Sequence, residues 1–143
     1  MQVFIIGSAL ETAQALDKKR LNKQIVECKQ ILNAIEGKTK AWANHPCTKQ
    51  YKEHIEWLIA YTHCLKSYFN NDIHKARIWN LYAMNLTPNF HTIDYLEQMK
   101  RRLYTKDNNH YNRWWFLGES QENWYWSTEE NRFIKYINGK KLK

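Results

Sequence analysis

Residues that interrupt regular structure are scarce: the 143-residue sequence has only two prolines and four glycines. This scarcity excludes a collagen-like or low-complexity chain, and an apolar fraction of 43% argues against extensive disorder. No run approaches the roughly 18 uncharged apolar residues of a membrane-spanning helix. We therefore expect one folded domain over residues 1–143, with no membrane contact.

Cysteine is also scarce, with Cys28, Cys47 and Cys64 in no C-x-x-C spacing. An odd number of cysteines argues against a disulfide framework, and their spacing argues against a zinc ribbon, so we expect reduced, buried thiols. The apolar start Val3–Ile6 lacks the basic flank and the length of a secretion signal, which predicts a cytoplasmic protein.

Positive charge and aromatic rings are abundant, with a net charge of +8 and 15% aromatic residues. Residues 1–40 carry seven basic and four acidic side chains, residues 41–99 five of each, and residues 100–143 ten and five. This composition is typical of nucleic-acid binding, because cations meet phosphates and rings stack on exposed bases. The distribution predicts that the two basic ends share a binding face, whereas the neutral middle builds the core.

Hydrophobic periodicity predicts helices over most of the chain, most clearly over residues 18–35. Asp17 is the expected N-cap of that helix and Gly37 its expected stop. Ser8 is expected to cap a shorter helix through Leu16, with Glu11 completing a capping box. The apolar stripe of residues 18–35 consists of Leu21, Ile25, Cys28, Leu32 and Ile35.

After a loop over residues 38–47, three further helices are expected, over 48–69 with Thr48 as cap, 72–85 and 92–104. The end of the chain differs, because two aromatic-rich runs, 124–126 and 132–136, flank a polar stretch. These runs predict a short hairpin or an aromatic tail. The predicted fold class is all-α: a compact single-domain helical fold with an aromatic C-terminal segment.

Motifs for metals and phosphate-binding loops are incomplete. His54-Ile55-Glu56 matches the H-x-E half of a zinc-dependent nucleobase deaminase, but Pro46-Cys47 precedes it and no second cysteine follows at the required spacing. Neither a G-x-x-x-x-G-K loop nor a G-x-G-x-x-G loop occurs. We therefore predict no metal and no cofactor.

A polar stripe opposite the apolar one contains Arg20, Lys23, Glu27 and Gln30 at steps of three and four residues. A single carboxylate among cations suits the stabilisation or relay of charge beside a DNA backbone. The competing interpretation is an ordinary Lys23–Glu27 surface pair worth a few tenths of a kcal/mol.

Two further groups have the composition of a nucleic-acid site. In the loop Trp42–Pro46, Pro46 restricts His45 to an extended backbone conformation. Asn44 and His45 offer hydrogen-bonding groups that could read a base edge or position a water. The alternative interpretation is a tryptophan anchor with turn-forming neighbours. Near the C-terminus, cationic side chains alternate with large aromatic rings, a pattern typical of residues that bind phosphates and stack on bases. The alternative is a solvated helix end followed by tryptophans of the core. That second group is Arg101, Arg102, Lys106, Arg113, Trp114 and Trp115.

These segments together resemble the pyrimidine-dimer DNA glycosylase-like family, small all-α proteins related to the phage UV-repair enzyme endonuclease V. The resemblance extends from residue 1 to about residue 126. It rests on Leu16-Asp17-x-x-Arg20-Leu21-x-Lys23-Gln24-x-Val26-Glu27, on Trp42-x-Asn44-His45-Pro46, on Lys106-Asp107-x-x-His110-Tyr111 and on Tyr125-Trp126.

The resemblance implies an enzyme that bends duplex DNA, extrudes a nucleotide opposite the lesion and attacks the sugar C1′ with its N-terminal α-amine. A helix-borne glutamate assists, and the resulting Schiff base permits β-elimination. Glu27 matches that glutamate and Met1 supplies the amine. The lysine and arginine side chains near both ends of the chain bind the DNA phosphates. The family also implies the cytoplasm of a bacterial cell or of a phage-infected host.

Two positions depart from the family pattern. The family's amine belongs to a small residue exposed by removal of the initiator Met, whereas Gln2 is bulky and predicts retention of Met1. Retention displaces the amine by about one residue, roughly 3.3–3.6 Å in an extended chain. An arginine that precedes the family glutamate is Val26 here.

The sequence therefore predicts a DNA-binding base-excision glycosylase that acts on damaged or modified DNA such as pyrimidine dimers. The resemblance adds AP-lyase activity to this expectation. The alternative is a non-catalytic module, virus-encoded for instance, that reuses the fold to hold a nucleotide or a host protein. A structural interaction protein that assembles through its Trp-rich tail is a third interpretation.

Overall fold

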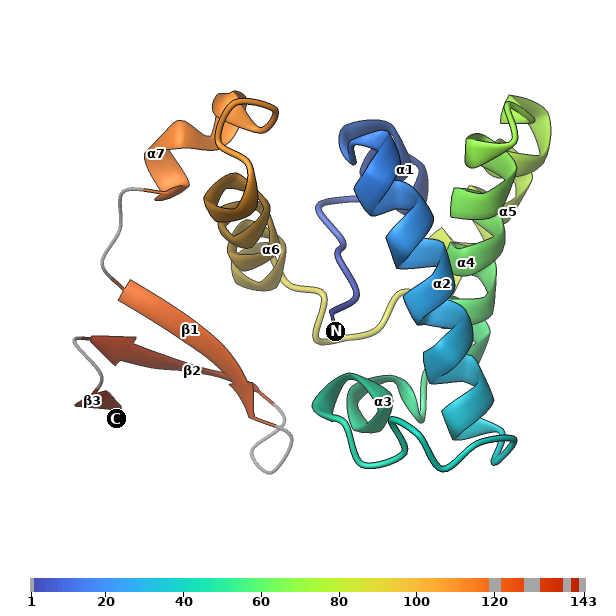
Figure 1. The fold of residues 1–143 in the computed structure, drawn as a ribbon, viewed down its shortest axis with the longest axis horizontal. Helices are drawn as coiled ribbons and strands as arrows, with labels where there is room; N and C mark the ends of the chain where they lie inside the picture. Colours follow the sequence, from blue (N-terminus) through green and yellow to red (C-terminus); the bar gives the residue numbers. More distant parts are fainter. Residues whose placement is uncertain (1, 119–121, 128–131, 138–139, 142–143) are drawn as a thin grey trace. The chain divides into compact units, whose positions relative to one another are not determined.

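The computed structural model describes residues 2–118, 122–127, 132–137 and 140–141 (Figure 1). The chain divides into two compact units, Met1–Pro88 and Asn89–Lys143. The prediction of a single domain over residues 1–143 stays a prediction. Among the described residues, no helix is long and apolar enough to cross a membrane.

The first two helices begin and end where local sequence signals place them. Ser8 caps α1 (Ala9–Ala15) in a complete capping box with Glu11, and Asp17 caps α2 (Lys18–Ile35) by accepting from the backbone N–H of Arg20. Beyond α2, Gly37 adopts φ 76°, the left-handed conformation that glycine takes without steric cost. These helices confirm the predicted boundaries.

The single helix predicted over residues 48–69 is wrong, because the structure divides it into α3 (Pro46–Tyr51) and α4 (Ile55–Phe69). The first helix begins before Thr48, since His45 is its N-cap and Pro46 fits the first turn without losing a needed N–H. The break lets Tyr51 stack on Trp57, with ring centroids 5.3 Å apart. Residues six apart in one continuous helix point to different sides, so an unbroken helix prevents this contact.

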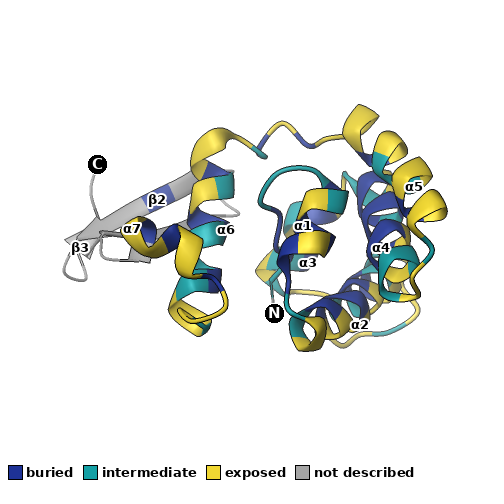
Figure 2. Ribbon diagram, turned by 90° about the horizontal axis from the view of Figure 1, so that it is seen from above, coloured by how far each residue is buried: buried dark blue, intermediate teal, exposed yellow. Residues whose placement is uncertain are grey.

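Helix α4 is the centre of the first unit, because it packs against α1, α2 and α5 (Ile73–Asn85). Figure 2 shows the buried residues concentrated along it. The contact with α5 uses the small buried residues Ala76 and Ala83, and the Sγ of Cys64 donates to the carbonyl oxygen of Ala76 at 3.3 Å. The unit is therefore a helical bundle around α4.

The second unit begins with α6 (Ile93–Lys106), which confirms the helix predicted over residues 92–104 and has Thr92 as its N-cap. A 3-10 turn η1 (Asn112–Trp114) and α7 (Trp115–Gly118) pack against α6. The strands β1 (Glu122–Ser127), β2 (Arg132–Ile137) and β3 (Lys140–Lys141) form an antiparallel sheet in the order β1-β2-β3. The helical fold is confirmed, the predicted hairpin is β1–β2, and the short third strand was not predicted.

Candidate active site

An extended N-terminal segment, residues 2–6, runs beside α2 in the first unit (Figures 1 and 2). Val3 and Ile5 are almost fully buried, and no strand pairs with the segment among the described residues. Buried backbone groups need partners, and here side chains supply them at residues 2, 4 and 6. Oγ1 of Thr12 accepts from the N–H of Ile6 at 3.1 Å, and the hydroxyl of Tyr61 donates to the carbonyl oxygen of Phe4.

The side-chain amide of Gln24 bonds to two points of this segment. Its Nε2 donates to the carbonyl oxygen of Gln2 at 2.8 Å, and its Oε1 accepts from the N–H of Phe4 at 2.6 Å. The side chain thus takes the place of a neighbouring strand. Because Gln24 is buried on a rigid helix, these bonds fix the start of the described chain relative to α2.

Glu27 lies one turn further along the same face of α2. Its Oε2 accepts from the backbone N–H of Gln2 at 3.3 Å, and its Oε1 lies 3.8 Å from Nζ of Lys23. The Glu27 side chain is only 15% exposed, whereas that of Lys23 is 72% exposed. The Lys23–Glu27 pair of the simpler interpretation therefore exists, but the carboxylate also contacts the first described residue. Met1, the predicted nucleophile, lies outside the described residues.

His45 is electrostatically coupled to this site. Burial lowers its pKa below the ordinary value, the positive amino terminus lowers it further, and the negative charge of Glu27 acts in the opposite direction. Nδ1 of His45 accepts from the N–H of Cys47 at 3.1 Å. That bond requires an unprotonated Nδ1, so the neutral ring carries its proton on Nε2.

The loop before α3 exposes a strained aromatic residue. Trp42 has φ 67°, which is unusual for a bulky side chain, and it is 43% exposed. Its ring meets that of His45 edge-on, with centroids 5.5 Å apart. Asn44 is exposed in the same loop. Strain held in an exposed loop beside a charged site is typical of functional positions.

Arg20, the second cationic residue predicted for the site on α2, pairs with an acidic side chain of the fold. Nη1 of Arg20 lies 3.1 Å from Oδ1 of Asp17, the residue that caps the helix. The side chain of Arg20 remains 25% exposed. Arg20, Lys23 and Glu27 therefore form the continuous stripe expected from their spacing.

The second unit carries the remaining predicted contacts. Arg101 and Arg102 are half-buried on α6 and Lys106 is exposed at its end; Nε and Nη1 of Arg101 have no hydrogen-bond partner among the described residues. Trp114 is buried, stacks on Tyr111 and lies 4.6 Å from the guanidinium carbon of Arg113, which is exposed. Trp115 is 56% exposed.

Thiol nucleophiles are not available in the core. Cys28 and Cys64 are buried, and burial raises the pKa of each thiol to about 12. The reactive form of cysteine is the thiolate, so both remain protonated at neutral pH. All three cysteines are reduced, and the prediction of buried thiols holds for Cys28 and Cys64 but is wrong for Cys47, which is half-buried.

Sequence patterns missed the residues that hold the N-terminal segment: Thr12, Gln24 and Tyr61. One signal for Gln24 was present, because it interrupts the apolar stripe between Leu21 and Cys28, where a polar side chain needs a buried partner. Nothing in the sequence indicated the backbone of residues 2–4 as that partner.

Residues 1–68 match the family model of the pyrimidine dimer DNA glycosylase. This match confirms the resemblance for that part of the chain, which contains α1, α2, α3 and nearly all of α4. It also contains Glu27, Gln24 and the loop of Trp42 and His45. No curated protein and no solved structure matches the chain.

Proposed function

We propose that this protein is a DNA glycosylase that cleaves the glycosidic bond of damaged pyrimidines in duplex DNA, with pyrimidine dimers as the substrate class. One observation carries the proposal: the backbone of Gln2 is held against the mostly covered carboxylate of Glu27. The match to the glycosylase family over residues 1–68 supports it.

The nucleophile in this proposal is the α-amine of Met1. An α-amine has a pKa of roughly 7.7–8.0, so a useful fraction is unprotonated at neutral pH. Its nitrogen forms a bond to the sugar C1′ as the bond from C1′ to the base nitrogen breaks, and the base leaves with the electron pair. Glu27 stabilises the positive charge that develops on the sugar and on the attacking nitrogen.

AP-lyase activity would follow from the same adduct. The nitrogen loses a proton, and its electron pair forms a double bond to C1′ as the C1′–O4′ bond of the sugar ring breaks. O4′ takes a proton, and the product is the Schiff base. Removal of a C2′ proton then expels the 3′ phosphate with its electron pair, which cuts the strand. This step needs the amine well placed beside Glu27, and positioning errors of about 1 Å cost up to 10²-fold in rate.

Contacts to DNA are assigned to the exposed members of the predicted groups. In the first unit we assign these contacts to Arg20, Lys23, Asn44 and His45: Lys23 pairs with Glu27, the charge of Glu27 acts on His45, and Arg20 and Asn44 are nearby in sequence. We assign Trp42 to stack on an extruded nucleotide, since its ring is exposed beside His45. In the second unit, the phosphate and base contacts fall to Arg101, Arg102, Lys106, Arg113 and Trp115, with Trp114 as buried support for Arg113.

The direct test uses one duplex oligonucleotide with a single thymine dimer and its undamaged twin. We expect alkali-labile sites at the dimer only, and nicks without alkali where the lyase step operates. Affinity for DNA should fall with salt, with a slope of about −0.9 per phosphate contacted. Absence of alkali-labile sites together with salt-insensitive binding of a small ligand overturns the proposal and supports the non-catalytic alternative.

A further inference from the structure

Two adjoining hollows lie on the side of α2 that faces away from Glu27. One has a volume of 310 Å³ and lies between α2 and α4, and the other has 390 Å³ and lies between α4 and α5. His63 and Lys66 border both. Lys29 lines the first hollow, and at about 100° of rotation per residue it points away from Glu27, two positions earlier.

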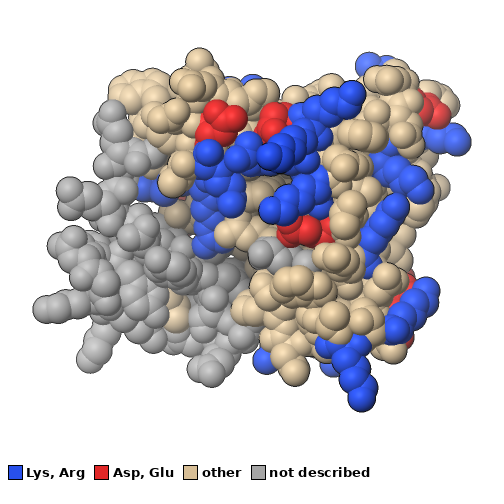
Figure 3. Space-filling view, viewed as in Figure 1, with Lys and Arg blue, Asp and Glu red and all other residues tan. Residues whose placement is uncertain are grey.

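Two lysines at these hollows have no acidic partner among the described residues. Lys38 pairs with Glu36 at 2.8 Å and Lys75 with Asp72 at 4.0 Å, whereas Lys29 and Lys66 make no ion pair with a described residue. Lysine and arginine side chains lie over α2 and α5 at the right of Figure 3. An uncompensated pair of ammonium groups beside a hollow favours an anion.

An aromatic wall stands beside these cations. The imidazole of His63 stacks on the indole of Trp79, with centroids 4.5 Å apart and an interplanar angle of 18°. His63, Lys29 and Lys66 all line the first hollow. Partial burial lowers the pKa of His63, and the charges of Lys66 and Lys29 lower it further. Trp79 lines only the second hollow, whereas His63 lines both hollows.

We infer that this surface binds a phosphorylated aromatic compound of about mononucleotide size, with its phosphate on Lys29 and Lys66 and its ring against His63 and Trp79. The first hollow is within the range of ligand pockets, roughly 300–1,000 Å³. A doubly charged phosphate gains from two ammonium groups, and a planar base gains from a ring of similar size. This site shares no residue with the one around Glu27, so it does not depend on the proposed glycosylase activity.

Titration calorimetry with the full chain tests the site, using a nucleoside monophosphate, the matching nucleoside and inorganic phosphate. We expect the monophosphate to bind at least about tenfold more tightly than either part. The Lys29→Gln/Lys66→Gln double variant should lose at least about tenfold in affinity for the monophosphate and none for the nucleoside. His63→Ala, which removes an exposed ring, should weaken the monophosphate but not inorganic phosphate.

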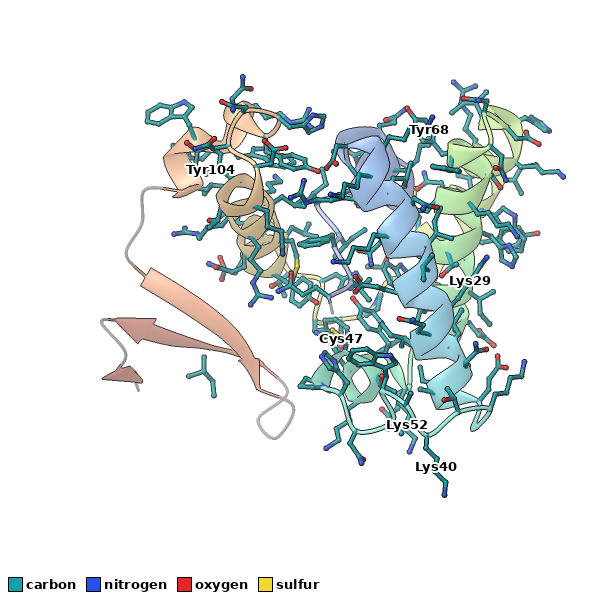
Figure 4. All side chains as sticks on the ribbon, in the orientation of Figure 1. Lys29, Lys40, Cys47, Lys52, Tyr68 and Tyr104 are labelled. Atoms are coloured by element: carbon teal, nitrogen blue, oxygen red, sulfur yellow. The ribbon has the colours of Figure 1, made fainter. Side chains whose placement is uncertain are left out.

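Lys52→Gln is the matched control, since it removes the same charge from an exposed residue beside α3, far from Lys29 in Figure 4. Equal losses in Lys52→Gln and in Lys66→Gln overturn the proposal, because the effect is then one of net charge. Inorganic phosphate binding as tightly as the monophosphate also overturns it. A 5′-phosphorylated oligonucleotide that binds more tightly than the mononucleotide supports the site and identifies a strand end as its ligand, whereas the opposite order identifies free nucleotide.

Discussion

The backbone nitrogen of Gln2 lies 3.3 Å from Oε2 of Glu27. One turn earlier on the same helix face, Gln24 bonds to the backbone on both sides of Val3. A single helix therefore carries both the carboxylate and the side chain that positions the chain's start. In a reaction that uses an N-terminal amine, this arrangement fixes the residue next to the amine relative to the carboxylate before DNA binds.

The identity of residue 2 should control the lyase step. Gln2→Ala places a small residue after the initiator Met, which permits its removal and leaves the new α-amine at the nitrogen now 3.3 Å from Glu27. We expect the yield of borohydride-trapped protein–DNA adduct to rise by at least about tenfold. Intact mass spectrometry identifies the N-terminal residue, and peptide mapping identifies the attached one.

Gln2→Leu is the control for this change, because leucine also removes the amide but keeps Met1 in place. Its adduct yield should stay at the wild-type level. An equal rise in Gln2→Leu and Gln2→Ala would show that the side chain, and not the position of the amine, limits the step.

Removal of the Gln24 amide should loosen the N-terminal segment. Gln24→Ala leaves the carbonyl oxygen of Gln2 and the N–H of Phe4 without their partners, at a cost of about 2–3 kcal/mol in the free energy of unfolding. At temperatures where the variant stays folded, we expect kcat for glycosidic cleavage to fall while KM for DNA is unchanged.

Gln30→Ala serves as the comparison, since Gln30 belongs to the same helix and is half-buried. Its free energy of unfolding should stay within about 0.5 kcal/mol of the wild type. A folded Gln24→Ala protein with wild-type kcat removes Gln24 from any positioning role.

Stability should fall as the pH is lowered through the ordinary histidine pKa. The pKa of His45 is lowered in the folded protein, so the unfolded chain binds more protons below about pH 6.5 and the free energy of unfolding decreases there. His63 acts in the same direction. His45→Asn keeps a good N-cap and removes one titrating group, so urea unfolding between pH 7.5 and 5.5 should show a smaller decrease. Equal decreases in the two proteins contradict the assignment.

Substitution of Trp42 should lower the activity without lowering the stability. Asparagine tolerates φ 67° better than a bulky side chain, so Trp42→Asn should leave the melting temperature unchanged or raise it. Loss of the exposed ring should reduce glycosidic cleavage of the dimer-containing duplex, because an extruded nucleotide loses its stacking partner. A variant with lower melting temperature and full activity shows instead that Trp42 serves the fold.

Local signals were sufficient for α2. The cap at Asp17 and the stop at Gly37 are properties of neighbouring residues, and the structure has both. Of the predicted apolar stripe, Leu21, Ile25 and Cys28 are buried, but Leu32 and Ile35 are only half-buried, because Ile31 and Ala34 face the core in that half of the helix. The break between α3 and α4 was not predictable in the same way, because it serves the stacking of Tyr51 on Trp57, a tertiary contact. Periodicity describes one helix face and does not show which ring will pack beneath another.

The candidate site was predictable in part. Spacing and resemblance made Glu27 a candidate, and its role stays a prediction. Its contact with Gln2 depends on how residues 2–6 pass α2, which no local pattern encodes. The adjacent rings Trp114 and Trp115 are equivalent in composition, yet one is buried and the other exposed. A 3-10 turn advances about 120° per residue, so consecutive side chains point to different sides.

The most direct test of the account is the Glu27→Gln variant on the dimer-containing duplex. The substitution keeps the size and the acceptor oxygen of the side chain but removes its charge. We predict that single-turnover cleavage of the glycosidic bond falls by at least about 10²-fold, while the dissociation constant for the same duplex changes by less than about threefold. Cleavage at the wild-type rate in Glu27→Gln would contradict the central claim that this carboxylate, held against the start of the chain, serves glycosidic cleavage.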